Sequence, residues 1–145
     1  MKKILLFAIV LAFTATSAIA QSTPDSLIKV EQKHDFGKIK QGVPVEYSFE
    51  IKNISNKPVV VENSWATCGC TTPEKITEPI MPGATAKLKV QYNAASAAPF
   101  TKDVYIKLAG VDQTKTLQIT GEVLSVEAYD AFVKEKGKSK DSKNN

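Results

Sequence analysis

The sequence predicts an all-β protein, an Ig-like antiparallel β-sandwich of about seven strands. Apolar and polar residues alternate through several short segments, as they do on a strand with one buried face. Glycine, proline and asparagine interrupt these segments about every 8–12 residues, a spacing typical of sandwiches. No helical stretch separates the segments, which excludes a parallel α/β fold. The chain has 145 residues, enough for one domain with its own core.

The expected domain covers residues 27–124. Its clearest strand has five apolar residues that alternate with polar ones over nine positions: Val43, Val45, Tyr47, Phe49 and Ile51. Further strands are expected at residues 27–33, 36–40, 59–62, 84–92, 104–108 and 117–123. The turn at residues 53–58 includes Asn53-Ile54-Ser55, which also fits an N-glycosylation acceptor. Residues 125–145 are expected to form a weak helix followed by a Lys-rich disordered tail.

The first twenty residues have the three parts of a secretory signal peptide. Two lysines precede an apolar run, Ile4 to Phe13, which is too short to span a bilayer as a helix. Ala18-Ile19-Ala20 then fits a cleavage site, so we expect cleavage after Ala20 and a short flexible lead-in at residues 21–26. The mature protein is therefore predicted to be periplasmic or secreted, with no membrane span.

Net charge argues against nucleic acid as a partner. The formal charge is +4, but residues 21–133 hold 12 Lys against 13 acidic residues, and the chain has no Arg. The bidentate contacts that Arg makes to phosphate and guanine are therefore unavailable. The excess of lysine in the C-terminal tail leaves a weak attraction to an anionic envelope surface as an alternative.

Both cysteines of the chain lie in one short loop, as Cys68-Gly69-Cys70. Two thiols in an oxidising compartment usually pair, so we expect a disulfide. Positions i and i+2 of a strand are about 6.6 Å apart at roughly 3.3 Å per residue, more than the about 5.5–6 Å that a disulfide prefers. A turn is therefore needed, and we expect Gly69 to allow it through a positive φ.

Other chemistry of this loop stays open at the sequence level. A thiol-redox role is one alternative, although C-x-C differs from the C-x-x-C of thioredoxin-like sites. Copper or zinc handling is another, with Cys68, Cys70, His34 and Met81 as the available ligands. No cofactor is expected.

We expect no catalytic activity. His34 and Asp35 are adjacent, so on a strand their side chains point to opposite faces and form no dyad. We expect these two residues to begin a strand instead, with the Asp35 side chain hydrogen-bonded to nearby backbone. The expected role is that of a protein-interaction or structural module of the cell envelope. As an interaction module, the monomer would bind an unknown envelope or extracellular protein through an exposed sheet edge or the loop Trp65, Thr67, Cys68, Gly69, Cys70 and Thr71.

Several short motifs together resemble a known exported bacterial family. They are His34-Asp35-Phe36-Gly37, Gly42, Phe49, Asn53, Cys68-Gly69-Cys70-Thr71 and Pro82-Gly83. The sequence resembles a "domain of unknown function" family of Ig-like sandwiches similar to ASH (ASPM–SPD-2–Hydin) and PapD-like domains, over residues 28–123. The chain departs from the family at Ala98-Pro99-Phe100, where a Gly is expected before the Phe. The resemblance implies an architecture and no established activity.

Overall fold

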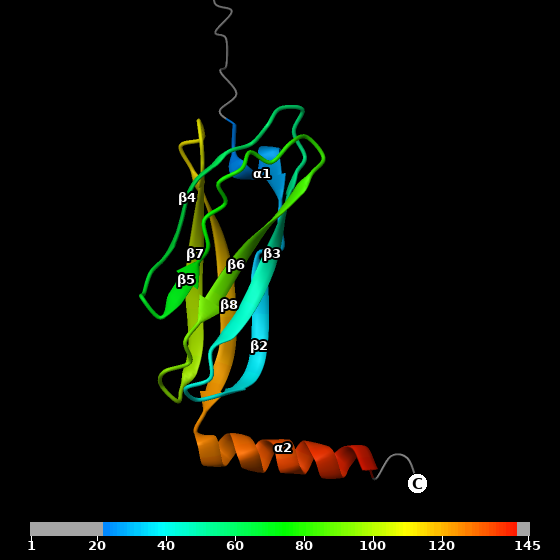
Figure 1. Cartoon of the computed structure of the whole chain (residues 1–145), viewed down its shortest axis with the longest axis vertical. Helices are drawn as coiled ribbons and strands as arrows, with labels where there is room; N and C mark the ends of the chain where they lie inside the picture. Colours follow the sequence, from blue (N-terminus) through cyan, green and yellow to red (C-terminus); the bar gives the residue numbers. More distant parts are fainter. Residues whose placement is uncertain (1–21, 142–145) are drawn as a thin grey trace, which may run out of the picture.

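Eight strands form two four-stranded sheets in the computed structural model, which describes residues 22–141 (Figure 1). The first sheet has the order β1-β3-β6-β5 and the second the order β2-β8-β7-β4. The strands are β1 (Ile28–Lys29), β2 (Lys33–Lys40), β3 (Val45–Asn53), β4 (Val61–Ala66), β5 (Thr71–Pro73), β6 (Thr85–Tyr92), β7 (Pro99–Leu108) and β8 (Thr114–Leu124). The Ig-like sandwich is confirmed, and β5 is the strand that the sequence did not predict. The predicted signal peptide, residues 1–20, lies outside the described residues.

One strand pair departs from the predicted antiparallel pattern. β2 runs parallel to β8, with His34 opposite Ile119 and Lys40 opposite Leu124, while the other paired strands are antiparallel. After β1 the chain crosses from the first sheet to the second. There it forms the edge strand β2, which lies beside β8 and runs in the same direction. A bulge between Asp35 and Lys38, with Gly37 at φ 65°, shifts the register of this edge strand.

The alternating apolar residues meet between the sheets as predicted. The inward positions of β3, β6, β7 and β8 are almost completely buried: Phe49, Ile51, Leu88, Val90, Val104, Ile106, Leu108, Leu117 and Ile119. Val43, placed by the sequence in the strongest strand, precedes that strand and is exposed. The period-two pattern therefore located the core correctly, with an error of two residues at each end of this strand.

The N-terminal segment is held against the sandwich. Residues 24–26, expected in the flexible lead-in, form the helical turn α1 (Pro24–Leu27) together with Leu27, which was expected to begin the first strand. The Asp25 carboxylate pairs with the Nζ of Lys115, whose side chain is 7% exposed. A buried lysine needs such a partner, so this contact fixes α1 on the first residues of β8.

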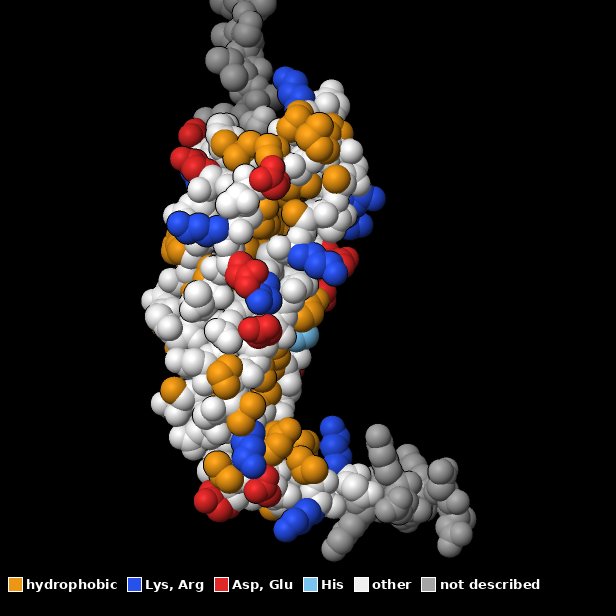
Figure 2. Space-filling model, viewed as in Figure 1, with side chains coloured by type: hydrophobic (Ala, Val, Ile, Leu, Met, Phe, Trp, Pro, Cys, Tyr) orange, Lys and Arg blue, Asp and Glu red, His pale blue; other side chains and the backbone are white. Residues whose placement is uncertain are grey.

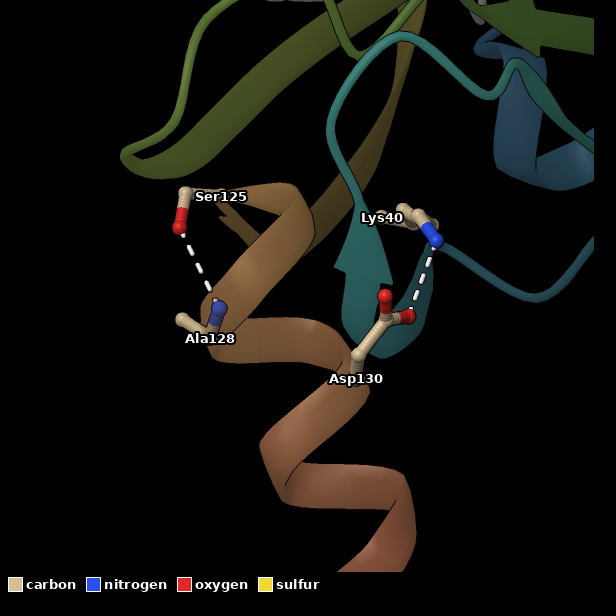
Figure 3. Close-up of polar contacts among 4 residues, drawn as sticks. All are labelled: Lys40, Ser125, Ala128 and Asp130. Carbon is tan, nitrogen blue, oxygen red and sulfur yellow. Dashed lines mark hydrogen bonds and ion pairs between the residues drawn. The ribbon is translucent and has the colours of Figure 1, made fainter.

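The C-terminal segment is a helix, α2 (Val126–Asp141), that projects from one end of the sandwich (Figure 1). Ser125 Oγ accepts a hydrogen bond from the N–H of Ala128 at 3.2 Å, and Lys40 Nζ lies 2.8 Å from Asp130 Oδ1 (Figure 3). The helix continues to Asp141, whereas the sequence suggested a disordered tail from residue 134. Lysine and glutamate are good helix formers, which favours helix in this segment.

Asn53 is a structural residue at the end of β3. Its side chain is fully buried, and Nδ2 donates to the carbonyl oxygens of Lys57 at 2.8 Å and Ile80 at 2.7 Å. Its Oδ1 accepts from the N–H and the hydroxyl of Ser55. The amide is thus fully used in closing the turn, which is why the turn reading of Asn53-Ile54-Ser55 fits and the glycosylation reading does not.

Candidate interaction loop between β4 and β5

Residues 65–71, here called the Cys loop, carry the chain from one sheet to the other. β4 is the edge strand of the second sheet and β5 the edge strand of the first, so the loop crosses the side of the sandwich between them. Ser64 Oγ donates to the carbonyl oxygen of Glu74 at 2.9 Å and ties β4 to the segment after β5. The loop is therefore anchored at both ends by sheet structure.

The two cysteines lie at disulfide distance. Their sulfur atoms are 1.96 Å apart and their Cα atoms 5.2 Å apart. The N–H of Thr71 bonds to the carbonyl oxygen of Cys68 at 3.2 Å, which closes the turn that the sequence required. The expectation that Gly69 adopts a positive φ is wrong, since the glycines at positive φ are Gly37, Gly42, Gly83 and Gly110. The hydrogen-bonded turn brings the cysteines together with ordinary backbone angles.

Thr71 holds the loop to the body of the protein. Its side chain is 4% exposed, and its hydroxyl oxygen lies 3.8 Å from Cys68 Sγ and 3.9 Å from Cys70 Sγ. Cys70 accepts a backbone hydrogen bond from Asn93 at 3.0 Å and packs against the core. The sulfur pair is thus held on its inner side by Thr71 and the core, and both cysteines are half-exposed.

Trp65 is the large exposed side chain of the Cys loop. It is 38% exposed and stacks on Tyr105 of β7, with ring centroids 5.5 Å apart and an angle of 25° between the rings. The two residues are directly opposite in the β4–β7 register, on the outer face of the second sheet. Thr67 and Gly69 are exposed beside them. Sequence analysis missed Tyr105, although its place between the inward Val104 and Ile106 already put it on the outer face.

The residues considered as metal ligands lie in different parts of the fold. His34 is on β2, and Met81 is an exposed residue of the β5–β6 connection beside the Val59–Ile80 bridge. Within residues 22–141, no three His, Cys, Asp or Glu side chains are grouped as a metal site. The structure therefore leaves Cys68 and Cys70 without the third and fourth ligands that zinc normally takes.

His34 and Phe36 belong to a packed group, here called the aromatic corner: His34, Phe36, Tyr47, Tyr92 and Phe100. His34 stacks on Tyr47 at a centroid distance of 3.5 Å, and Tyr92 stacks on Phe100 at 4.0 Å. Asp35 points away and its Oδ1 accepts the N–H of Gly37 at 3.0 Å, as predicted. This motif packs aromatic rings from β2, β3, β6 and β7 against one another and contains no dyad.

Tyrosine hydroxyls in this corner hold their protons more tightly than usual. Burial raises the pKa of Tyr47, and its hydrogen bond to Glu31 and the charges of Glu31 and Glu50 raise it further. Burial alone raises the pKa of Tyr92. Both rings therefore act as neutral packing groups near neutral pH.

Comparison with solved structures supports the fold. The chain is similar to a protein of unknown function from Porphyromonas gingivalis W83 at a TM-score of 0.59 and 14% identity, covering 67% of this chain and 46% of that one. The VesB protease of Vibrio cholerae gives 0.57 and 14%, covering 68% and 32%. PapD-like domain 7 of human CEP192, an ASH / PapD-like domain, gives 0.55 and 12%, covering 73% and 91%.

These likenesses concern the fold alone. The chain spans less than half the length of the first two proteins, and their identities are low. Among curated proteins, none matches this sequence. A model of the family described as "Protein of unknown function (DUF1573)" matches residues 28–123, which include the motifs around His34 and Cys68. The chain therefore belongs to the DUF1573 family.

Proposed function

We propose that this protein is a non-catalytic interaction module of the bacterial cell envelope, which binds a partner protein through the Cys loop. The observation that carries the proposal is Trp65, exposed and held flat on Tyr105. Tryptophan and tyrosine dominate binding hot spots because they offer large rigid surfaces with few torsions to fix. A tethered loop also loses little entropy when it binds.

Export of the protein, as a monomer without a cofactor, is part of the proposal. The first twenty residues have the composition of a cleavable signal peptide, and an oxidising compartment suits a cysteine pair at disulfide distance. Among the residues that the structure covers, no helix is long and apolar enough to cross a membrane. We therefore propose a periplasmic or secreted location, on the signal-peptide composition and the cysteine pair.

The surroundings of the Cys loop also support binding over catalysis. Thr67 and Thr71 contribute hydroxyls, and the hydroxyl of Ser64 is engaged with the Glu74 carbonyl, so these groups offer no general base. Figure 2 shows acidic and basic side chains interspersed over the face it draws, without the single-sign surface that nucleic acid binding requires.

Site-specific crosslinking tests the proposal. A photoreactive amino acid in place of Thr67 should form a defined adduct in the intact envelope, and the same group in place of Lys57, in the turn after β3, should not. Trp65→Ala should abolish the adduct, whereas Val60→Ala, which removes another exposed apolar side chain before β4, should keep it. An adduct that survives Trp65→Ala but disappears in Cys68→Ala/Cys70→Ala would instead favour the thiol-redox alternative.

A further inference from the structure

At the edge opposite the Cys loop, the first sheet is only partly covered by a strand. β1 has two residues and pairs only with Lys52 and Asn53 of β3. The chain then crosses to the second sheet, so the part of β3 from Val45 to Glu50 has β6 on one side and no strand on the other. Figure 1 shows β3 and β5 on opposite sides of β6. We call residues 45–50 the open edge.

Every second residue of the open edge points its backbone N–H and C=O groups away from β6. Ile54 donates its N–H to the Leu27 carbonyl at 2.9 Å on the β1 side, whereas Asn53 donates to Ala84 at 2.9 Å on the β6 side. Backbone groups alternate between the two sides of a strand, so Ser48 and Glu50 face the same way as Ile54. Within residues 22–141, no loop residue forms a backbone hydrogen bond with Ser48 or Glu50.

A hollow lies where an additional strand would fit. It has a volume of about 680 Å³ and is lined by residues 29–31, by Tyr47, Ser48, Glu50 and Lys52 of β3, and by Thr85 of β6. A strand placed there would continue the line of β1 along β3. Its inward residues would reach the half-buried ring of Tyr47, which stacks on His34 at the margin of the core.

Acidic side chains flank residues 45–50, whereas Lys29 and Lys52 line the end of the hollow where β1 pairs with β3, and Lys89 lies 3.9 Å from Glu46. Glu46 and Glu50 project from the outer face of β3, and Glu31 lies across the hollow with its carboxylate 3.1 Å from the Tyr47 hydroxyl. A second copy of the chain is a poor occupant, because antiparallel pairing of two β3 edges about Ser48 would place Glu46 opposite Glu50 twice. A basic strand complements these charges.

We propose that the open edge binds an extended segment of a partner protein, in which apolar residues alternate with lysine or arginine. The segment would add a strand to the first sheet by hydrogen bonds to the backbone of Ser48 and Glu50. Residues opposite each other on paired strands share a face, so the basic side chains would lie beside Glu46 and Glu50 and the apolar ones would face Tyr47. This site is separate from the Cys loop of the proposed function.

This arrangement predicts which N–H groups of a bound peptide form hydrogen bonds to β3. We expect the added strand to run antiparallel to β3, as β1 does. Its residues opposite Ser48 and Glu50 then face outward and bond to β3 through their own backbone. In the probe acetyl-Lys-Val-Lys-Val-Lys-Val-Lys-amide, the lysine N–H groups would therefore bond to β3 and the valine N–H groups would face solvent. N-methylation of the valines should preserve binding, whereas N-methylation of the lysines should abolish it.

Titration of the full chain with this probe, followed by amide NMR, tests the proposal. The amide signals of Ser48 and Glu50 should shift and their hydrogen exchange should slow. Replacing every lysine of the probe by glutamate, or introducing Glu50→Lys into the protein, should weaken binding by about fivefold. The matched variant Glu62→Lys, on the exposed edge strand β4, should bind normally.

Several outcomes would overturn the proposal. They are no binding of the lysine probe, equal binding of the two N-methylated probes, and shifts confined to residues outside β3. Dimerisation of the free protein that shifts the amide signals of Ser48 and Glu50 would identify a second copy as the occupant instead. Trp65→Ala should leave probe binding unchanged, so failure at this edge and failure at the Cys loop are distinguishable.

Discussion

The aromatic corner and the Cys loop are built from the two most distinctive motifs of the sequence, yet they do opposite things. In the corner, Phe100 is buried beneath Tyr92 and beside Phe36, and each ring has ring neighbours. In the loop, Trp65 has one ring neighbour and an open face. A distinctive motif can therefore serve packing or recognition, and burial of its largest side chain separates the two.

Truncating one ring in each region gives the largest expected contrast. Phe100→Ala should lower the free energy of unfolding by about 3–5 kcal/mol, because it leaves a cavity in the corner. Trp65→Ala should cost about 1 kcal/mol or less, since it removes one cross-strand aromatic contact. Urea denaturation followed by circular dichroism measures both, with equal slopes expected for the two variants. Similar losses in both variants would mean that the Cys loop is part of the core.

Substitution of Gly121 or Gly69 by alanine should give a second, smaller difference in stability. A Cβ on Gly121 would lie 2.8 Å from the Phe100 ring and 2.9 Å from the Gly37 carbonyl oxygen, whereas a Cβ on Gly69 would meet no atom within 4 Å. Gly121→Ala should therefore cost about 1–3 kcal/mol through overpacking. Gly69→Ala should change stability by about 0.5 kcal/mol or less, as exposed substitutions do. A loss at Gly69 equal to that at Gly121 would show that the loop needs glycine after all.

The sequence predicted what depends on alternation and missed what depends on contacts between strands. The inward residues of β3, β6, β7 and β8 follow from their period of two. β5 could not be found that way, because three residues carry no period. The space that Gly121 leaves for Phe100 depends on the β7–β8 register, where these two residues are directly opposite. That register is set by the whole sheet.

The candidate site was predicted in part, for the same reason. Local spacing was enough to expect a turn that brings Cys68 and Cys70 together, but the assignment of a positive φ to Gly69 was wrong. The turn is closed by the Thr71 N–H, and its backbone angles depend on where β5 begins. Pairing of Trp65 with Tyr105 required the β4–β7 register.

Removing the cysteine pair should have a modest effect on stability, smaller than that of Phe100→Ala. Cys68→Ala/Cys70→Ala should lower the free energy of unfolding by about 1.6 kcal/mol, the chain-entropy value for a three-residue loop, and should keep the fold. Thr71 and the backbone bond from Asn93 to Cys70 remain to hold the loop. Urea denaturation measures the loss, and a reducing agent added to the wild-type protein should reproduce it.

This variant also separates a structural role of the sulfur pair from a role in recognition. If the pair only positions the loop, the double variant should still form the Thr67 adduct, with a lower yield because the loop is less restrained. A matched variant, Thr71→Val, keeps the sulfur atoms and removes the hydroxyl beneath them, so it should affect the adduct in the same direction. Global unfolding of the double variant would show instead that the loop staples the two sheets together, and the contrast with the aromatic corner would then fail.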